Sequence, residues 1–391
     1  MHATRKIIFL LDLSESFSRN LIQGISRYAD IYGPWSFCKM TPSYRDQYGI
    51  EGIIEFAREW KADCLVGQFQ DENEVKQLIE AGLKLIAVDY IEPFDTIANI
   101  SGNYRKSGEM AADYFLSRGF KNFAFYGMPN TVWSRERENA FRKKIQAVGL
   151  SVNSYSPDAS KNRQFWFYTA STLKDWLLSL PKPVAIFTCD DNRAEHLMEA
   201  AKMAKIHIPE EMALLSVDND ELICKTSTPS LSSIQQDEIN GGFLAAELME
   251  KMIQEHRIIK QDILLEPLQI ITRHSSDVFA LDDPYIKKAL IYIKEHLDTP
   301  LNVTEICRQI PLSRRALEIR FKNQLNRSIY EEVKRQRMEK FVFLLLNSDL
   351  PINDMATLCG FPDSKNLARV FASQFAMSPS VYRKRFSFNK I

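Results

Sequence analysis

Residues 214–220 read LLSVDND, an apolar run that ends in three carboxylate or amide side chains. Short runs of this kind are typical of strands buried in a parallel sheet, and the polar residues follow where the strand ends. Similar runs are Lys6–Leu11, Cys64–Gly67, Leu85–Val88, Phe123–Tyr126, Ala185–Thr188 and Ile263–Leu265. The stretches between them have helical spacing: Phe17–Tyr32, Glu72–Ala81, Lys106–Arg118, Ser134–Val148, Thr169–Leu180, Arg193–Met203 and Asp237–His256. Repeated alternation of strand and helix predicts parallel sheets covered by helices on both faces.

This α/β pattern continues to about residue 270, which is longer than a unit built on a single sheet usually is. We therefore expect an α/β body of two lobes, each with a Rossmann-like parallel sheet, and a cleft between them. From Asp282 onward the strand pattern disappears and the chain reads as helices only. The expected domains are a ligand-binding body at 1–275, a linker at 276–284 and an all-α domain at 285–391.

The formal net charge is zero, but the charges are unevenly distributed along the chain. Residues 283–391 hold 19 Lys and Arg against 11 Asp and Glu, whereas residues 1–282 hold 31 against 39. An acidic body joined to a basic tail indicates that the tail binds a polyanion, and a helical basic tail favours DNA.

The cysteines and the apolar runs indicate which kinds of site and which cellular compartment to expect. The six cysteines form no C-x-x-C pair, and no histidine stands at ligand spacing. We therefore expect no disulfide framework, no metal site and no cofactor. The run Ile7–Leu11 is too short for a signal peptide, and no run is long enough to span a membrane. The prediction is a cytoplasmic protein without membrane contact.

Two segments of the tail have the pattern of a helix-turn-helix. In the first, Val303–Ile310 and a turn at Pro311-Leu312 precede a helix that Ser313 is suited to cap. The second has a turn at Gly360-Phe361-Pro362, after which Asp363 or Ser364 is suited to cap the helix. Both helices carry a Leu and a Phe four residues apart, which must pack inward. Between the two units, Ser328–Leu346 predicts one helix of about 28 Å, close to the length of a DNA turn.

The tail resembles the DNA-binding domain of the AraC family, whose signature ends Gly-Phe…Phe…Phe…Ser-Pro…Tyr-Arg. Here these residues are Gly360, Phe361, Phe371, Phe375, Ser378, Pro379, Tyr382 and Arg383. Outward-facing polar residues of the two helices are the expected DNA contacts, because Arg reads guanine, Glu accepts from cytosine and Lys holds phosphate. They are Ser313, Arg314, Arg315, Glu318, Lys322, Ser364, Lys365, Asn366 and Arg369. Ala376 stands where the family usually has glycine, so we expect that turn to differ from the one at Asn326.

In the body, the residues after each strand are the expected ligand contacts, because two-lobed α/β folds bind small ligands at the carboxyl ends of their strands. Carboxylates suit sugar hydroxyls and aromatic rings suit sugar C–H faces. A single Asp after a strand is more often a helix cap or turn residue, and the recurrence after several strands makes the ligand-contact interpretation about equally favoured. The motif order resembles the sugar-binding body of LacI-type repressors and periplasmic sugar-binding proteins, and that resemblance places Arg137, Asp190, Asp218 and Gln236 at sugar-contacting positions. The expected ligand site is Asp12, Asp89, Tyr90, Trp133, Arg137, Asp190, Asp218 and Gln236.

A LacI-like body followed by an AraC-like tail is itself similar to the architecture of regulators of pentose catabolism. That similarity implies a homodimeric transcription activator that responds to D-xylose or a related pentose, binds an operator in double-stranded DNA and contacts RNA polymerase. A regulator of another sugar with the same architecture remains an alternative. A sugar-metabolising enzyme is the alternative of a different class, although no G-x-G-x-x-G, G-x-x-x-x-G-K-[ST], G-x-S-x-G or H-E-x-x-H string occurs. We expect no catalytic residue.

Overall fold

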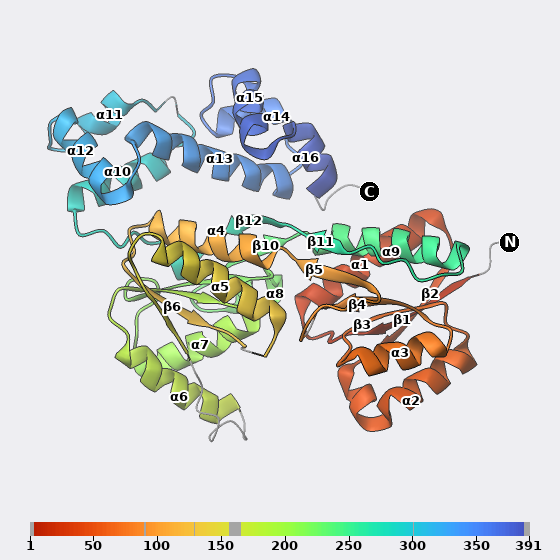
Figure 1. The fold of residues 1–391 in the computed structure, drawn as a ribbon. Helices are drawn as coiled ribbons and strands as arrows, with labels where there is room; N and C mark the ends of the chain where they lie inside the picture. The colour runs from red at the N-terminus through yellow and green to blue at the C-terminus, as the bar shows by residue number, and fades with distance from the viewer. Residues whose placement is uncertain (1–3, 90, 129, 156–165, 300, 387–391) are drawn as a thin grey trace.

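The computed structural model describes residues 4–89, 91–128, 130–155, 166–299 and 301–386. These residues form two α/β lobes and an all-helical domain that lies along one side of both lobes (Figure 1). The predicted fold class is confirmed. No helix in the described part of the chain is long and apolar enough to cross a membrane.

The first lobe is built on a parallel sheet with strand order β11-β5-β4-β3-β1-β2. Its strands are β1 (Arg5–Leu10), β2 (Trp35–Met40), β3 (Cys64–Gly67), β4 (Lys84–Val88), β5 (Ala98–Gly102) and β11 (Ile263–Leu265). Its helices are α1 (Ser16–Tyr32), α2 (Pro42–Trp60), α3 (Glu72–Glu80) and α9 (Glu238–Gln254). α1 and α9 cover one face of the sheet, and α2 and α3 cover the other. The close approach of α1 and α9 requires glycine, since a Cβ on Gly24 would lie 1.9 Å from the Ile239 carbonyl oxygen.

The second lobe has strand order β12-β10-β9-β8-β6-β7, parallel except for β12. Its strands are β6 (Asn122–Tyr126), β7 (Val152–Ser154), β8 (Val184–Thr188), β9 (Met212–Val217), β10 (Ser232–Gln236) and β12 (Pro267–Ile271). Its helices are α4 (Tyr104–Leu116), α5 (Val132–Gln146), α6 (Trp166–Ser179), α7 (Asp191–Ala204), α8 (Glu221–Thr226) and the short 3₁₀ helix η1 (His274–Ser276). The chain passes between the lobes after β5, after β10 and after β11, so these three crossings form the hinge.

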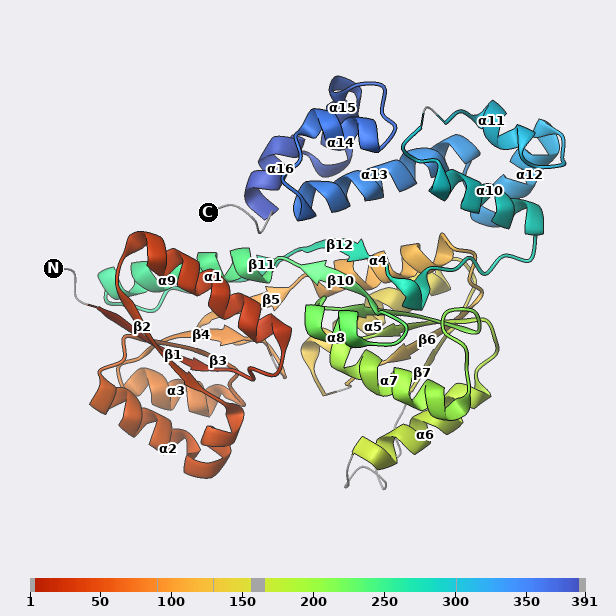
Figure 2. The same ribbon diagram turned by 180° about the vertical axis from the view of Figure 1, so that it is seen from behind.

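The helical domain contains the two predicted helix-turn-helix units, and the views from opposite sides agree that α13 runs over the hinge side of the body (Figures 1 and 2). Its helices are α10 (Pro284–Glu295), α11 (Val303–Arg308), α12 (Arg314–Leu325), α13 (Ile329–Asn347), α14 (Ile352–Leu358), α15 (Ser364–Phe375) and α16 (Pro379–Phe386). Each unit has its own apolar core, one around α10 to α12 and one around α13 to α16. The expected long helix is confirmed, with Ser328 as its N-cap.

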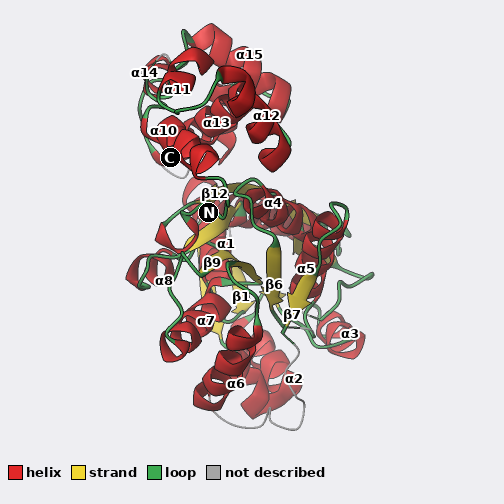
Figure 3. Cartoon of the chain, turned by 90° about the vertical axis from the view of Figure 1, so that its left-hand side faces the viewer, coloured by secondary structure: helices red, strands yellow, loops and turns green. Residues whose placement is uncertain are grey.

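The segment between body and tail, which the sequence suggests is a polar linker, is packed against both. Ser276 shares a hydrogen bond with the Tyr114 hydroxyl at 2.6 Å, and the Ala280 amide donates to the Arg118 carbonyl at 2.9 Å. Phe279 and Leu281 pack against the core of the first helix-turn-helix unit. The end-on view shows the helical domain above the lobes (Figure 3), and α13 contacts the hinge strand β12.

Candidate functional site

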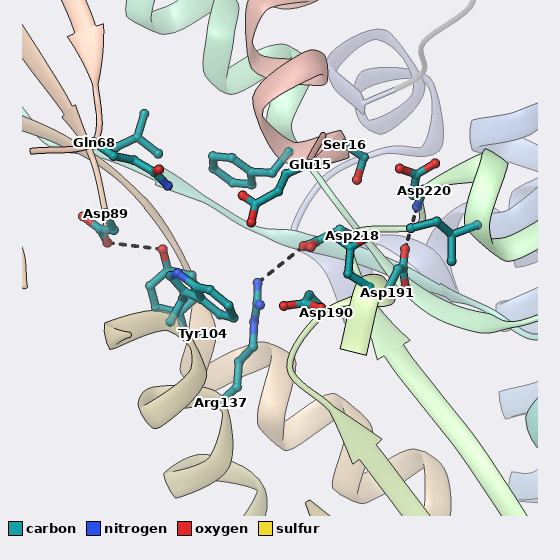
Figure 4. A pocket seen from close by; sticks show the side chains of 15 residues that line it. Glu15, Ser16, Gln68, Asp89, Tyr104, Arg137, Asp190, Asp191, Asp218 and Asp220 are labelled. Atoms are coloured by element: carbon teal, nitrogen blue, oxygen red, sulfur yellow. Dashed lines mark hydrogen bonds and ion pairs between the residues drawn. The ribbon is translucent and has the colours of Figure 1, made fainter. Parts of the chain in front are cut away.

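The carboxyl ends of strands from both lobes face a common cavity (Figure 4). The first lobe contributes Glu15, Gln68 and Asp89, and the second contributes Arg137, Asp190 and Asp218. The cleft is therefore lined by both lobes and is predominantly acidic.

Arg137 of α5 is the buried cation of the cleft. Its Nη1 donates to the Cys189 carbonyl oxygen at 2.5 Å, and its Nη2 lies 3.7 Å from Asp218 Oδ1. The guanidinium lies over the rings of Tyr104 and Trp133, at 5.2 and 5.6 Å from their centroids. Its Nε has no protein partner although it is buried. A buried donor of this kind favours a ligand oxygen.

Asp89 follows β4 and is the buried acceptor opposite Arg137. Its Oδ2 accepts a hydrogen bond from the Tyr104 hydroxyl at 3.2 Å, while Oδ1 is buried without a partner. Burial raises the pKa of Asp89 to about 6, and the nearby Ser101 and Tyr104 hydroxyls oppose that shift. The unpartnered oxygen leaves room for a hydroxyl donor from a ligand.

Asp218 lies directly after β9, in the left-handed backbone region at φ 98°. Gln236 Nε2, at the end of β10, donates to its Oδ1 at 3.0 Å. Burial raises the pKa of Asp218 to about 6, and the charge of Arg137 opposes that shift. Gln236 is fully buried and its Oε1 has no partner. This pair stands at a hinge crossing, because Asp237 begins the passage to α9.

Asp190 is both a cavity residue and a helix cap. Its Oδ1 accepts from the Arg193 amide at 2.7 Å, and its Oδ2 lies 3.3 Å from Arg193 Nη1. The neighbouring Asp191 accepts from the Asp220 amide and from Ser233 Oγ, at 2.6 and 2.7 Å. Burial raises the pKa of Asp191 to about 8. Asp191 thus fixes the loop after β9 and presents Asp218 to the cleft.

Five of the eight predicted ligand residues line the cavity, and among the described residues Asp12 and Gln236 are not part of its lining. Asp12 does not line the cavity, because its carboxylate accepts from the amide and hydroxyl of Ser14 at 2.9 and 2.7 Å in a local turn. Tyr90 lies outside the described residues. Trp133 lines the cavity, and Gln236 reaches it through Asp218.

Among the cavity residues that the predicted ligand site does not include are Glu15, Gln68 and Tyr104. Gln68 directly follows β3, so the rule applied to the other strands would have found it. Tyr104 follows β5, a strand that the sequence patterns did not reveal. Glu15 gives no sequence signal, yet burial and the nearby Asp190 and Asp218 raise its pKa to about 7.

Two ion pairs join the lobes at the edges of the cleft. Arg19 of α1 pairs with Asp220 of the second lobe, and Glu92 of the first lobe pairs with Arg135 of α5. Both pairs require the lobes to stand close together. They therefore favour the closed arrangement of the cleft.

In the first helix-turn-helix unit, Ser313 caps α12 by accepting from the Ala316 amide at 3.2 Å. Arg314 Nε donates to Glu318 Oε1 at 2.9 Å, and Lys322 Nζ donates to the Asn326 carbonyl at 3.2 Å. Arg315 is exposed. Of these three cations of α12, Arg315 is therefore presented directly, and Arg314 and Lys322 are held in contacts along the helix.

In the second unit, Asp363 caps α15 by accepting from the Asn366 amide at 2.6 Å, so Ser364 is the first residue of the helix. Lys365 and Arg369 are exposed. The expected difference between the turns after the two recognition helices was wrong. Ala376 has φ 55° and Asn326 has φ 57°, so both are left-handed C-caps despite the Cβ of alanine.

The helical domain is docked on the hinge. Leu268 of β12, two residues after the last crossing, packs into the core of the second unit with Phe341 and Tyr382. Arg327 Nη2 also donates to the Ser117 carbonyl at 2.9 Å, and Asp277 pairs with Lys294. Packed side chains therefore connect the hinge with the helix-turn-helix units.

Comparison with known proteins agrees with this architecture. Residues 112–276 match the periplasmic binding protein-like domain, and residues 297–385 match a helix-turn-helix domain. The xylose operon regulatory protein of Haemophilus influenzae is 29% identical over 388 residues, covering 97% of this chain and 98% of that protein. Its namesake from Escherichia coli is 26% identical, covering 97% and 96%. The solved structure of the xylose-binding transcription activator xylR is 25% identical with a TM-score of 0.59, covering 99% of both chains. This chain is a periplasmic binding protein-like domain followed by a helix-turn-helix domain, and along nearly its whole length it is similar to the xylose operon regulatory proteins.

Proposed function

We propose that this protein is a sugar-responsive, sequence-specific DNA-binding transcription regulator whose effector is D-xylose or a related pentose. The observation that carries the proposal is a polar interlobe cleft whose hinge strand β12 contributes Leu268 to the core of the second helix-turn-helix unit. In this proposal residues 1–275 bind the effector, residues 276–284 connect, and residues 285–391 bind DNA. The relatives are named as transcription regulators, so we propose no catalytic role.

The cleft suits a neutral polyhydroxyl ligand. Asp89 Oδ1 is a buried acceptor and Arg137 Nε a buried donor, and neither has a protein partner. A sugar hydroxyl can satisfy both kinds of group because it donates and accepts. The rings of Tyr104 and Trp133 flank the same space, where they can cover C–H faces. We propose Asp89, Trp133, Arg137, Asp190, Asp218 and Gln236 as the ligand set, joined by Glu15, Gln68 and Tyr104, and we assign Asp12 to the local turn.

The choice of D-xylose within this ligand class rests on the relatives. The two curated relatives carry xylose operon in their names, and the solved full-length relative is titled a xylose-binding transcription activator. Identity of 25–29% over nearly the whole chain supports a shared effector. An activator also needs a contact with RNA polymerase, and we propose this as a partner of the DNA-bound protein in the cytoplasm.

Effector binding is coupled to the DNA-binding domain through the hinge. Sugar contacts from both lobes are complete only in the closed cleft, so the ligand favours closure by its differential affinity for the two states. Closure moves β12 relative to the first lobe, and Leu268 carries that movement into the second helix-turn-helix unit. We propose that the protein acts as a homodimer, in which this movement changes the spacing of two DNA-binding domains.

The test uses the purified full-length chain. Isothermal titration calorimetry with D-xylose, D-ribose, L-arabinose and D-glucose should give saturable binding for D-xylose, lost in Arg137→Ala. In parallel, duplexes are selected from a random-sequence pool by the protein with and without D-xylose, and their affinities are measured by fluorescence anisotropy. A chain that binds none of these sugars, or that binds its selected duplex with the same affinity and footprint in their presence and absence, would overturn the proposal. Turnover of any sugar would favour the enzyme alternative.

A further inference from the structure

Ile319 lies at the centre of the exposed face of α12. It is 51% exposed, and it is the one large hydrophobic side chain that this helix exposes. The buried residues Leu317, Phe321 and Leu325 lie on the opposite side at 100° per residue. Arg315 precedes Ile319 by one turn and Lys322 follows by nearly one turn, so an apolar side chain interrupts a basic surface. A single exposed isoleucine needs no explanation on an ordinary surface, but this surface is the proposed DNA contact.

The second recognition helix shows which way Ile319 faces. The N-caps Ser313 and Asp363, the buried Phe321 and Phe371, and the left-handed C-caps Asn326 and Ala376 correspond pairwise. The same register places Ile319 of α12 at the position of Arg369 in α15, and both side chains are exposed. At this outward position one helix therefore carries an apolar side chain and the other a cation.

The neighbours of Ile319 leave its side chain exposed on the outer face of α12. Glu318 is engaged by Arg314 at 2.9 Å, and Lys322 turns to the Asn326 carbonyl at 3.2 Å. Arg315 and Ile319 are thus the two adjacent side chains that face outward at the middle of α12.

Resting on the proposed function, we infer that Ile319 packs against the C5 methyl group of a thymine in the major groove, next to a guanine read by Arg315. The thymine methyl is the apolar feature of the major groove, whereas the other base edges present donors and acceptors. An isoleucine against those polar edges would leave them unpaired, which costs free energy. The half-site of α12 therefore contains a thymine that the half-site of α15 does not require, since Arg369 occupies the corresponding position there.

The test removes one methyl group at a time from DNA. The probe is a duplex that the full-length protein has selected from a random-sequence pool in D-xylose. Each thymine is replaced singly by deoxyuridine, which lacks only the C5 methyl. Replacement at one position, or at either of two adjacent positions, should weaken binding about fourfold, as expected for the loss of one buried methyl-sized group. In Ile319→Ala the unmodified duplex should bind about as weakly as the wild type binds the deoxyuridine duplex, with no further loss on substitution.

The matched control is Ile291→Ala. Ile291 is 42% exposed on α10, on the side opposite that helix's buried residues. This variant should retain the wild-type response to deoxyuridine. Ile319→Ala should also leave the salt dependence of binding unchanged, because a methyl contact releases no counterion. The inference is overturned if no thymine is methyl-sensitive, or if Ile319→Ala keeps the wild-type sensitivity. A pool that yields no sequence preference at all would instead overturn the proposed function.

Discussion

The Tyr382 hydroxyl of α16 donates a hydrogen bond of 3.4 Å to the Leu268 carbonyl of β12, joining the last helix of the chain to the strand that follows the last hinge crossing. Both residues are buried, at 5% and 6% exposure. The contact lies on the path by which closure of the cleft would reach the DNA-binding domain. It links residues 114 positions apart in sequence, and no local pattern specifies it.

The first prediction concerns this contact. Tyr382→Phe should leave sugar affinity unchanged but reduce the ratio of DNA affinities with and without D-xylose by about two- to fivefold, because it removes one buried hydrogen bond between the coupled parts. Leu268→Ala should reduce the ratio further. Fluorescence anisotropy with the selected duplex measures both. Leu264→Ala is the control, since Leu264 of β11 is 59% exposed. An unchanged ratio in Leu268→Ala would exclude this path.

The interlobe pair Arg135–Glu92 gives the second prediction. Arg135→Ala should weaken D-xylose binding by about two- to fivefold, the range expected for a partly exposed ion pair worth up to about 1 kcal/mol. The loss should shrink in high salt, which screens exposed charges. Exchanging the two charges in the double variant Glu92→Arg/Arg135→Glu should restore part of the affinity. Calorimetry at low and high salt checks this, and equal affinity in Arg135→Ala and wild type would remove the pair from the closing mechanism.

A third prediction follows from the raised pKa of Asp89. A sugar hydroxyl donates to the carboxylate and not to the protonated acid, so binding favours the charged form. Affinity should therefore be full above the pKa of about 6 and fall as pH decreases through it. Lowering the pH from 7.5 to 5 should weaken D-xylose binding about tenfold per titrating carboxylate. Asp218, with a pKa also raised to about 6, adds to the same slope.

The matched variant for this pH profile is Asp89→Asn. It should bind D-xylose more weakly at pH 7.5, and its affinity should decline less between pH 7.5 and 5, because one carboxylate fewer titrates while Asp218 and Glu15 still do. Calorimetry at both pH values gives the two slopes. An Asp89→Asn profile as steep as that of the wild type would show that Asp89 does not meet the ligand.

The fourth prediction distinguishes base recognition from phosphate contact on α12. Arg315→Ala should cost roughly 1–3 kcal/mol on the selected duplex and relax the base preference, whereas Lys322→Ala should weaken all sequences about equally and flatten the salt slope by about one. Competition between selected and random duplexes over a range of salt measures both effects. Equal losses on specific and random DNA for Arg315→Ala would contradict its role in reading bases.

Much of the body could be predicted because its central strands are continuous apolar runs. β10 was missed for a physical reason. Ser232 and Ser233 are fully buried, and their polarity is satisfied by the Arg273 carbonyl and the Asp191 carboxylate. A buried polar strand reads as a loop when its distant partners are unknown. Edge strand β2, which is half-exposed, likewise lacks the apolar run.

The site residues were predictable where the position of a residue after a strand alone determines that its side chain faces the cavity. Asp89, Asp190 and Asp218 each follow a strand, and the parallel sheets place all three at the cavity. Asp12 follows β1 in the same way, yet the nearby Ser14 offers two donors and the carboxylate turns to them. A local competitor two residues away decides that orientation, and strand-end position carries no information about it.

The last prediction concerns Ala376, which adopts a left-handed conformation that the sequence argument did not expect. A left-handed conformation brings Cβ against the backbone and costs a non-glycine residue roughly 1–2 kcal/mol of folding free energy. Replacement by glycine removes this cost, but the greater conformational entropy of glycine in the unfolded state offsets part of the gain. Ala376→Gly should therefore stabilise the protein by about 1 kcal/mol, seen as a higher midpoint of thermal unfolding followed by circular dichroism. Asn326→Gly is the matched control at the equivalent C-cap, and it should change stability little, since asparagine tolerates this region. A lower midpoint for Ala376→Gly than for the wild type would mean that the alanine methyl group contributes more by packing than its backbone strain costs.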